Sequence, residues 1–297
     1  MPCYYPLDGW WSKDRHPSTG RRRVVFRVAD ALTDRPIQVP CGQCVGCRLE
    51  RSRQWAIRCM HEAALYDNNC FITLTYNDDN LPAGKTLVLE DFQKFMKRLR
   101  KFFPQTIRFF HCGEYGEINA RPHYHACLFN CDFPDRKLYK VVGEHRLYTS
   151  QILDNLWSVN GNSLGFATVG DVSFESAAYV ARYVMKKVTG GNADQHYGDR
   201  LPEYCTMSRR PGLGSAWVEK FKDDVYPFDG VIARGFPSRP PRFYDAMFEM
   251  TDPDVFREIR RKRKLASKER KWDQTSSRHK VRETVKKAQI EHLERKL

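Results

Sequence analysis

The sequence predicts an α+β fold, with a central antiparallel sheet and helices on one face in a ferredoxin-like arrangement. Short β-branched and aromatic runs bounded by turn residues alternate with longer stretches of helical periodicity, in the order β-α-β-β-α-β-α. Aromatic residues make up 13% of the chain and hydrophobic residues 41%, which is typical of a globular protein rather than of a disordered one.

The first strand and the first helix of this pattern carry the clearest signals. The strand spans residues 71–76, reads Phe-Ile-Thr-Leu-Thr-Tyr, and has asparagine or aspartate on both sides. The helix spans residues 89–103 and stops before Pro104, which cannot continue it. Its apolar side chains recur at helical spacing and its other face is basic, so we expect one buried and one solvated face.

The remaining core elements follow in order. We expect two strands at 106–112 and 123–129, joined by the glycine-containing loop 113–116, and then a short helix at 150–157, a weaker strand at 166–172 and a helix at 174–188. The glycine pair Gly190-Gly191 is expected to end this last helix.

Four segments are predicted along the chain. Residues 1–66 form a cysteine-rich N-terminal region with a basic helix at 49–66, residues 67–192 the core, residues 193–252 an accessory region and residues 253–297 a basic tail. From Phe256 onward the tail has 16 lysines and arginines against 6 acidic residues, an excess of ten positive charges. We expect a solvated helix or a disordered tail, and an arm that tracks phosphates is compatible with both.

The charge of the chain restricts its partners. The formal net charge is +14 and the isoelectric point is about 9.3, which favours nucleic acid or an anionic membrane surface. No apolar run is long enough for a transmembrane helix, and the first 30 residues lack the apolar stretch of a secretory signal. We therefore expect a nucleic-acid partner and no membrane.

His123 and His125 are the first candidates for chemistry. Side chains alternate along a strand, so both imidazoles point to one face and can bind one divalent ion. A third ligand is needed, and Glu114 is the best candidate because a hairpin would bring it beside the pair; Glu117 is second and His111 third. Such a ligand set favours Mg²⁺ or Mn²⁺. The alternative is a histidine pair on a solvated strand face.

The helix at 174–188 provides the second candidate group. At 100° per residue its alanines and valines fall on one stripe, whereas Tyr179, Tyr183 and Lys186 fall together on the opposite side. A phenol of pKa ~10 is a weak nucleophile near neutral pH, and a nearby cation would stabilise the phenolate that attacks a phosphodiester. The pattern therefore predicts nucleophilic tyrosines, and the alternative is an ordinary solvated helix face.

The third candidate is a cysteine cluster. Ten cysteines without an export signal indicate a reducing compartment, in which thiols stay free or bind metal. Three of them form a C-x-x-C-x-x-C run that suits a structural Zn²⁺ site. The run is Cys41, Cys44 and Cys47, and the fourth ligand is Cys3, Cys59 or His61. Free thiols and an iron–sulfur cluster are the alternatives.

Aromatic and basic residues interleave near the N-terminus. Tyr4, Tyr5, Trp10 and Trp11 lie close to Arg15 and to the arginines at 21–23. Such a mixture stacks unpaired bases over a phosphate-binding surface in some proteins. Packing of the segment on the core is the other interpretation.

Three motifs occur in an order that resembles the rolling-circle replication initiators of the HUH endonuclease superfamily. They are Phe71-Ile-Thr-Leu-Thr75, the His-Tyr-His of 123–125, and Tyr179-x-x-x-Tyr183-x-x-Lys186. More narrowly, Cys-Gly-Glu-Tyr-Gly at 112–116 before Arg-Pro-His-Tyr-His at 121–125, with two tyrosines, resembles the initiators of small single-stranded DNA bacteriophages of the microvirus family, gokushovirus type. The resemblance covers residues 71–190.

The resemblance implies a function for each motif. His123 and His125 would be metal ligands with Glu114 as the third, and Tyr179 and Tyr183 would be alternating nucleophiles. Such an enzyme nicks an origin and rejoins the strand through a 5′-phosphotyrosine intermediate, so its partners are single-stranded DNA and origin-containing duplex, with no small-molecule substrate. It acts in the cytoplasm of the bacterial host. Since the sequence has no Walker-type loop, unwinding would need a host helicase, and a host polymerase would extend the 3′ end.

One position departs from the family pattern, in which a lysine often precedes the second tyrosine. Arg182 stands there instead and is a fixed cation, so it can stabilise a phosphate but cannot act as an acid. Together with Lys187 it is a candidate DNA contact. The rival interpretations are a related relaxase or transposase and a non-catalytic zinc-containing nucleic-acid-binding protein, and the latter leaves the histidines and the tyrosines unexplained.

Overall fold

The chain divides into two compact units. A computed structural model describes residues 3–17, 20, 22–116, 119–143, 145–186, 191 and 193–294, without the side chains of 183–186, 293 and 294. Unit 1 comprises residues 1–51 and 260–297, and unit 2 comprises residues 52–259. Helices α1 (Val45–Ala63) and α8 (Pro253–Glu269) cross the boundary between the units. The predicted division into four segments stays a prediction.

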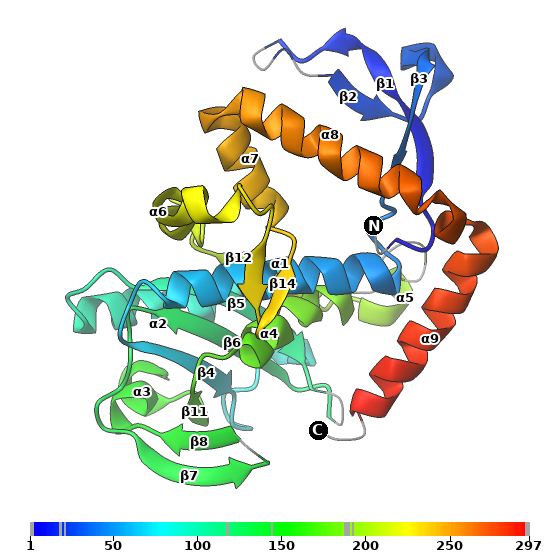
Figure 1. Cartoon of the computed structure of the whole chain (residues 1–297). Coiled ribbons are helices and arrows are strands. Elements are labelled where there is room, and N and C mark those ends of the chain that lie inside the picture. The colour runs from blue at the N-terminus through cyan, green and yellow to red at the C-terminus, as the bar shows by residue number, and fades with distance from the viewer. Residues whose placement is uncertain are drawn as a thin grey trace. The chain divides into compact units, whose positions relative to one another are not determined.

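Unit 2 is built on a seven-stranded antiparallel sheet with the strand order β12-β5-β6-β4-β11-β8-β7, in which β7 lies at one edge (Figure 1). The strands are β4 (Asn69–Thr75), β5 (Arg108–Tyr115), β6 (Pro122–Phe129), β7 (Lys137–Val142), β8 (His145–Thr149), β11 (Ala167–Gly170) and β12 (Tyr204–Met207). Both β4 and β5 pair antiparallel with β6, so the helix between them, α2 (Leu89–Phe102), closes a split β-α-β unit. The predicted α+β class is confirmed.

Helices cover both faces of this sheet, so the expectation of helices on one face is wrong. The two connecting helices, α2 and α3 (Gln151–Leu156), pack on the first face through Phe95 and Leu153. Helices α1 and α4 (Phe174–Lys186) pack on the second face through Ala56 and Val180. The reason lies in the central strands, where both alternating sets of side chains become apolar and each needs its own cover.

The accessory part of unit 2 has a core of its own. It consists of α5 (Ala193–Tyr197), α6 (Ser215–Val225), the hairpin β13 (Val231–Ala233) with β14 (Phe236–Ser238), and α7 (Arg242–Thr251). Short pieces elsewhere in the unit are η2 (Ala83–Lys85), β9 (Ser158–Val159) and β10 (Asn162–Ser163). Val218, Tyr244 and Phe248 meet the start of α8 in a separate apolar cluster.

Unit 1 contains a three-stranded antiparallel sheet that the sequence pattern did not predict. Its strands are β1 (Leu7–Arg15), β2 (Arg22–Val25) and β3 (Ala31–Val39), in the order β2-β1-β3, with η1 (Val28–Asp30) before β3. The end of α8, η3 (Lys271–Gln274) and α9 (Ser276–Glu294) complete the unit, so the tail is a set of largely exposed helices, as expected. None of the helices in the described ranges is both long and apolar enough for a membrane crossing.

Candidate functional site

The β5–β6 hairpin places Glu114 directly opposite His123, and β4 on the other side of β6 places Thr73 opposite His125. Strand β5 extends to Tyr115, three residues beyond its predicted end, so Glu114 lies in the strand rather than in the loop. The glycine before it is required, because a Cβ on Gly113 would lie 2.9 Å from the ring of Tyr204. The hairpin thus fixes the carboxylate relative to both histidines.

Three ligand atoms converge on this face of the sheet. Glu114 Oε1 lies 2.6 Å from His123 Nε2 and 2.8 Å from His125 Nε2. Neighbouring ligand atoms around an octahedral ion with bonds of about 2.1 Å lie about 3.0 Å apart, close to these distances. The buried carboxylate, 2% exposed, and the two imidazoles are therefore arranged as ligands of one divalent ion.

The outer nitrogen of each imidazole has its own partner. His125 Nδ1 lies 2.9 Å from the hydroxyl of Thr73, and His123 Nδ1 donates to the carbonyl oxygen of Arg121 at 3.0 Å. The ring of Phe71 stacks on His125 with centroids 5.5 Å apart. Such contacts fix the orientation of an imidazole and keep Nε2 directed at Glu114, where a deprotonated Nε2 would bind a metal ion.

The electrostatics of Glu114 favour a bound cation. Burial raises the pKa of this carboxyl group, but hydrogen bonds from His123 and His125 outweigh burial and hold its pKa below the usual value. The group is therefore ionised although it is buried. Its second oxygen, Oε2, is buried and has no hydrogen-bond partner among the described residues. A buried carboxylate oxygen without a donor is the feature that a metal ion would satisfy.

Tyr179 on α4 reaches the same cluster. Its hydroxyl lies 3.5 Å from Glu114 Oε1, and its half-buried ring meets the ring of His125 edge-on with centroids 5.2 Å apart. The guanidinium of Arg182 lies 6.0 Å from the centre of the tyrosine ring. Ala177 and Val180 are fully buried, as the helical stripe predicts.

The other predicted residues of this site are only partly accounted for. Tyr183 and Lys186 belong to α4, but their side chains lie outside the described residues, as do Lys187 and Glu117 entirely. His111, the third choice of ligand, is not at the site. It is an odd number of residues from Glu114, so it faces the opposite side of the sheet, where it stacks on Phe92 at 3.4 Å.

Two functional residues were missed by the sequence analysis. Thr73 and Phe71 were recognised as part of a motif, but neither was given a role. The signal was available, because alternation along the strand puts both side chains on the face that His125 occupies on the neighbouring strand. Strand order, which the sequence does not state, was needed to use it.

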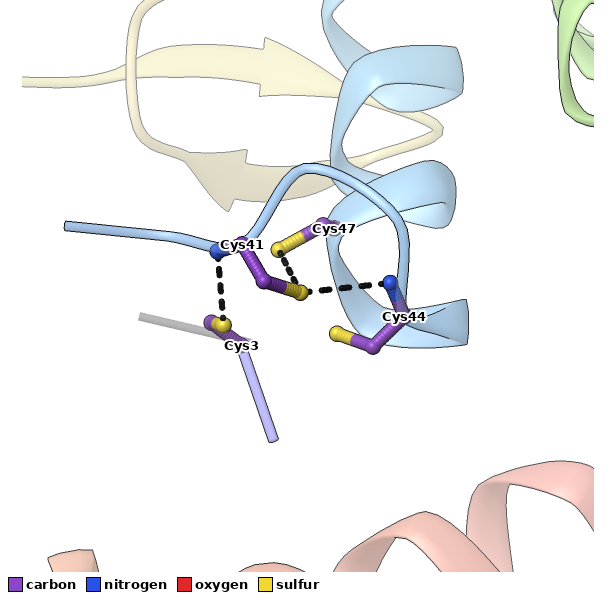
Figure 2. A group of neighbouring side chains, drawn as sticks. All are labelled: Cys3, Cys41, Cys44 and Cys47. Atoms are coloured by element: carbon purple, nitrogen blue, oxygen red, sulfur yellow. Dashed lines mark hydrogen bonds between the residues drawn. The ribbon is translucent and has the colours of Figure 1, made fainter. Parts of the chain in front are cut away.

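Unit 1 contains the second ligand cluster (Figure 2). Cys3 comes from the N-terminal segment, Cys41 and Cys44 from the turn before α1, and Cys47 from its first turn; the four side chains turn toward a common centre. Their sulfur atoms all lie within 4.8 Å of one another, and those of Cys41 and Cys47 are 4.0 Å apart. Tetrahedral Zn²⁺ with bonds of about 2.3 Å places its sulfur ligands about 3.8 Å apart.

Backbone amides surround these sulfur atoms. The N–H groups of Cys41, Cys44 and Tyr4 donate to the sulfurs of Cys3, Cys41 and Cys44 at 3.3, 3.3 and 3.4 Å. Burial raises the pKa of the Cys41 thiol, but backbone hydrogen bonds from Cys44 and Gln43 outweigh it and lower the pKa to about 7, whereas burial raises the pKa of Cys3 and of Cys47. The backbone therefore favours the thiolate at Cys41, and the thiolate is the form that binds metal.

The alternative fourth ligands are placed elsewhere. Cys59 packs with Ala56 and Phe110 in the apolar cluster under the sheet of unit 2. His61 stacks on Trp217, with ring centroids 3.5 Å apart. Cys3 is the residue that the structure brings to the three-cysteine run.

Fold and site together define a class, namely α+β proteins that present a His, His, carboxylate cluster beside a helical tyrosine. Comparison with known proteins gives the family. Residues 69–188 match the family model of replication-associated protein ORF2/G2P. Replication-associated protein VP4 of Bdellovibrio phage phiMH2K is 36% identical over 241 residues, which cover 77% of this chain and 73% of that protein. Replication-associated protein ORF2 of Spiroplasma virus 4 is 34% identical over 234 residues, which cover 73% of this chain and 70% of that protein.

These similarities span more than the motifs. The chain belongs to the family of phage replication-associated proteins, the microvirus-type initiators of rolling-circle replication. A third relative, replication-associated protein ORF4 of Chlamydia phage 1, is 28% identical over 69% of this chain and 52% of its own length. No solved structure matches the chain.

Proposed function

We propose that the chain nicks and rejoins single-stranded DNA at a replication origin by a metal-dependent tyrosine phosphotransfer. The observation that carries the proposal is the approach of the Tyr179 hydroxyl to within 3.5 Å of the carboxylate of Glu114, which also contacts His123 and His125. The split β-α-β order of β4, β5 and β6 supports a ferredoxin-like HUH endonuclease core as the scaffold.

His123, His125 and Glu114 would hold Mg²⁺ or Mn²⁺. The ion would polarise a phosphate oxygen of the DNA. Two neutral imidazoles and one carboxylate leave a divalent site with net positive charge, which attracts the scissile phosphate. Thr73 and the Arg121 carbonyl hold the two rings in place, so that the ligand atoms need not reorganise when DNA binds.

Tyr179 would act as a nucleophile. Its phenol oxygen forms a bond to the phosphorus while the bond from phosphorus to the 3′ oxygen breaks. The phenol proton goes to solvent and the 3′ oxygen leaves as a hydroxyl, which is the primer for synthesis. Rejoining is the reverse attack by a 3′-hydroxyl on the phosphotyrosine.

Tyr183 would provide the second nucleophile, since it follows Tyr179 by one helical turn on α4. A second tyrosine can attack another phosphate before the first releases its strand. Arg182 would stabilise phosphate charge, and Lys186 and Lys187 would extend the basic character of this helix toward the DNA. A host helicase and polymerase would act on the products in the host cytoplasm.

The test uses single-stranded oligonucleotides that tile the genome encoding the chain, each labelled at its 3′ end. The wild-type chain with Mg²⁺ should carry one label into a covalent adduct that survives denaturation, and chelation should prevent it. Tyr179→Phe combined with Tyr183→Phe should abolish the adduct. The control is Tyr139→Phe, because Tyr139 is 57% exposed on the edge strand β7.

Two results would count against the mechanism. Persistence of the adduct in the double variant would mean that another nucleophile attacks. If the chain binds DNA but forms no adduct in the presence of metal, the rival function, a zinc-containing nucleic-acid-binding protein, would be favoured.

The four cysteines of unit 1 would bind a structural Zn²⁺. Their sulfur spacing fits a tetrahedral site and excludes disulfides, which require about 2.05 Å between sulfurs. A site filled by four thiolates leaves no position for a substrate, so we assign it to folding rather than to catalysis.

A further inference from the structure

The positive charge of the chain is concentrated in one unit. Segments 1–51 and 260–297, which form unit 1, contain 24 of the 50 lysines and arginines but 10 of the 36 acidic residues. The excess in unit 1 is therefore 14 positive charges, equal to the net charge of the whole chain, +14. Unit 2 contains the remaining 26 basic and 26 acidic residues and has a formal net charge of zero.

The cations of unit 1 are presented to solvent on regular structure. Six lysines are exposed along the end of α8, η3 and α9, namely Lys262, Lys264, Lys268, Lys271, Lys280 and Lys287. Helices with exposed lysines at successive turns follow a linear array of phosphates without needing to read bases. Stacking of successive unpaired bases requires several aromatic platforms. Among the described residues of this stretch a single large aromatic side chain, that of Trp272, is exposed. The surface therefore fits duplex backbone better than it fits single strands.

The N-terminal segment ties these helices to the cysteine cluster. The backbone N–H of Tyr4 donates to Cys44 Sγ, and the hydroxyl of the next residue, Tyr5, donates to the carboxylate of Glu283 on α9. Glu283 is buried although it is charged, and it also pairs with Lys287. Tyr4 and Tyr5 thus connect the basic helix α9 to the cysteine cluster.

We propose that unit 1 is a duplex-DNA anchor, whose exposed lysines on α8 and α9 neutralise backbone phosphates of the DNA on which unit 2 acts. This inference rests on the proposed function, because an initiator that cuts one strand of a duplex origin must remain bound to the duplex while its nicking site binds that strand. It assigns the affinity for duplex DNA to unit 1 and the chemistry to the neutral unit 2.

The test measures the salt dependence of binding to a duplex of arbitrary sequence, with the full chain and without divalent metal. The anchor variant is Lys262→Gln, Lys264→Gln, Lys268→Gln. The affinity falls as salt rises, and each lost phosphate contact reduces the steepness of log affinity against log salt by about 0.9, so we expect a slope that is less negative by about 2.7. The matched control removes three exposed lysines of unit 2, Lys97→Gln, Lys101→Gln, Lys140→Gln, and should leave the slope unchanged.

An unchanged slope in the anchor variant would overturn the proposal, and so would a loss that affects single strands but spares duplex. Failure of the proposed function appears in a different assay, because it would remove the covalent adduct from the wild-type chain and leave the salt slopes as they are. If both proposals hold, the anchor variant forms the adduct at the wild-type rate on saturating single-stranded oligonucleotide.

Discussion

Three apolar clusters stabilise unit 2, and side chains as large as Trp157 and Phe95 are fully buried there. In the described part of unit 1 the corresponding cluster has Cys3, Tyr4 and Cys44 as its buried members. So small a core cannot offset the backbone entropy of ordering a three-stranded sheet. The comparison indicates that apolar burial stabilises unit 2, whereas unit 1 would depend on the structural metal that we propose for its cysteines.

The two units also use charge differently. In unit 2 the buried Arg108 is paired with Glu62, which also accepts a hydrogen bond from the backbone N–H of Gly214, so this charge supports the fold. In unit 1 the 24 lysines and arginines exceed the 10 acidic residues by 14. Buried paired charge that stabilises the fold thus lies in unit 2, whereas the excess positive charge lies in unit 1.

Removal of the metal should have the largest effect and should act on one unit only. Zinc bound by four thiolates contributes about 10–16 kcal/mol in small zinc domains, more than unit 1 can replace by burial. Cys44→Ser with chelator should therefore lower bound zinc and abolish hydrogen-exchange protection in β1, β2 and β3. Protection in β4, β5 and β6 should persist.

The control for this prediction is Cys205→Ser, because Cys205 is a half-buried cysteine on β12 of unit 2. It should leave zinc content and exchange in unit 1 unchanged. If β1 to β3 stay protected in the Cys44→Ser chain after chelation, unit 1 does not depend on the metal.

A smaller effect should appear in unit 2 as the pH falls. Burial lowers the pKa of His61 from 6.5 to about 4, so the folded chain keeps this imidazole neutral. The unfolded chain takes up the proton near pH 6.5 and thus binds more protons between pH 6.5 and 4. The free energy of unfolding should therefore decrease as pH falls through this window, by up to ~3 kcal/mol from this group.

His61→Phe isolates this contribution, since phenylalanine keeps the stack on Trp217 but cannot take up a proton. Denaturant unfolding followed by tryptophan fluorescence should show a shallower loss of stability between pH 6.5 and 4 in the variant. Equal pH dependence in the two chains would show that His61 is not the group responsible.

The sequence predicted the core of unit 2 better than the rest, for a physical reason. Strand β4 and helix α2 each bury one face in the large core, so alternation and helical periodicity are visible in their residues. Strand β3 has a single buried residue, Ala31, and carries charged residues and a proline, so no pattern marks it. Helices α1 and α4 were predicted as helices, but their packing on the second sheet face was not, because an apolar stripe does not state which face of a sheet it covers.

Prediction of the site depended on local geometry. Glu114 and His123 share a hairpin, so their proximity follows from sequence spacing, and Cys41, Cys44 and Cys47 share one turn. The approach of Tyr179 needs the packing of α4 on the sheet, and Cys3 meets its partners across 38 residues of chain. No local sequence pattern predicts either contact, although the family resemblance implied that Tyr179 belongs to the site.

The smallest expected effect concerns Thr73, whose hydroxyl lies 2.9 Å from His125 Nδ1. Valine has the same shape and cannot form this hydrogen bond, so Thr73→Val should loosen the orientation of the imidazole without changing the fold. Loss of such a partner typically weakens metal binding by ~10- to 100-fold. We expect the Mg²⁺ concentration that supports half-maximal adduct formation to rise by a factor in this range, with recovery at saturating Mg²⁺.

Thr206→Val is the matched control, because Thr206 Oγ1 contacts His111 Nδ1 at the same distance, 2.9 Å, on the opposite face of the same sheet. That substitution also removes a threonine–histidine hydrogen bond from a buried position, but it leaves the cluster around Glu114 intact. The Mg²⁺ requirement should therefore stay at the wild-type value. If both variants raise the required Mg²⁺ concentration equally, Thr73→Val acts by lowering the stability of the sheet. His125 then does not depend on the Thr73 hydroxyl for its orientation toward the metal.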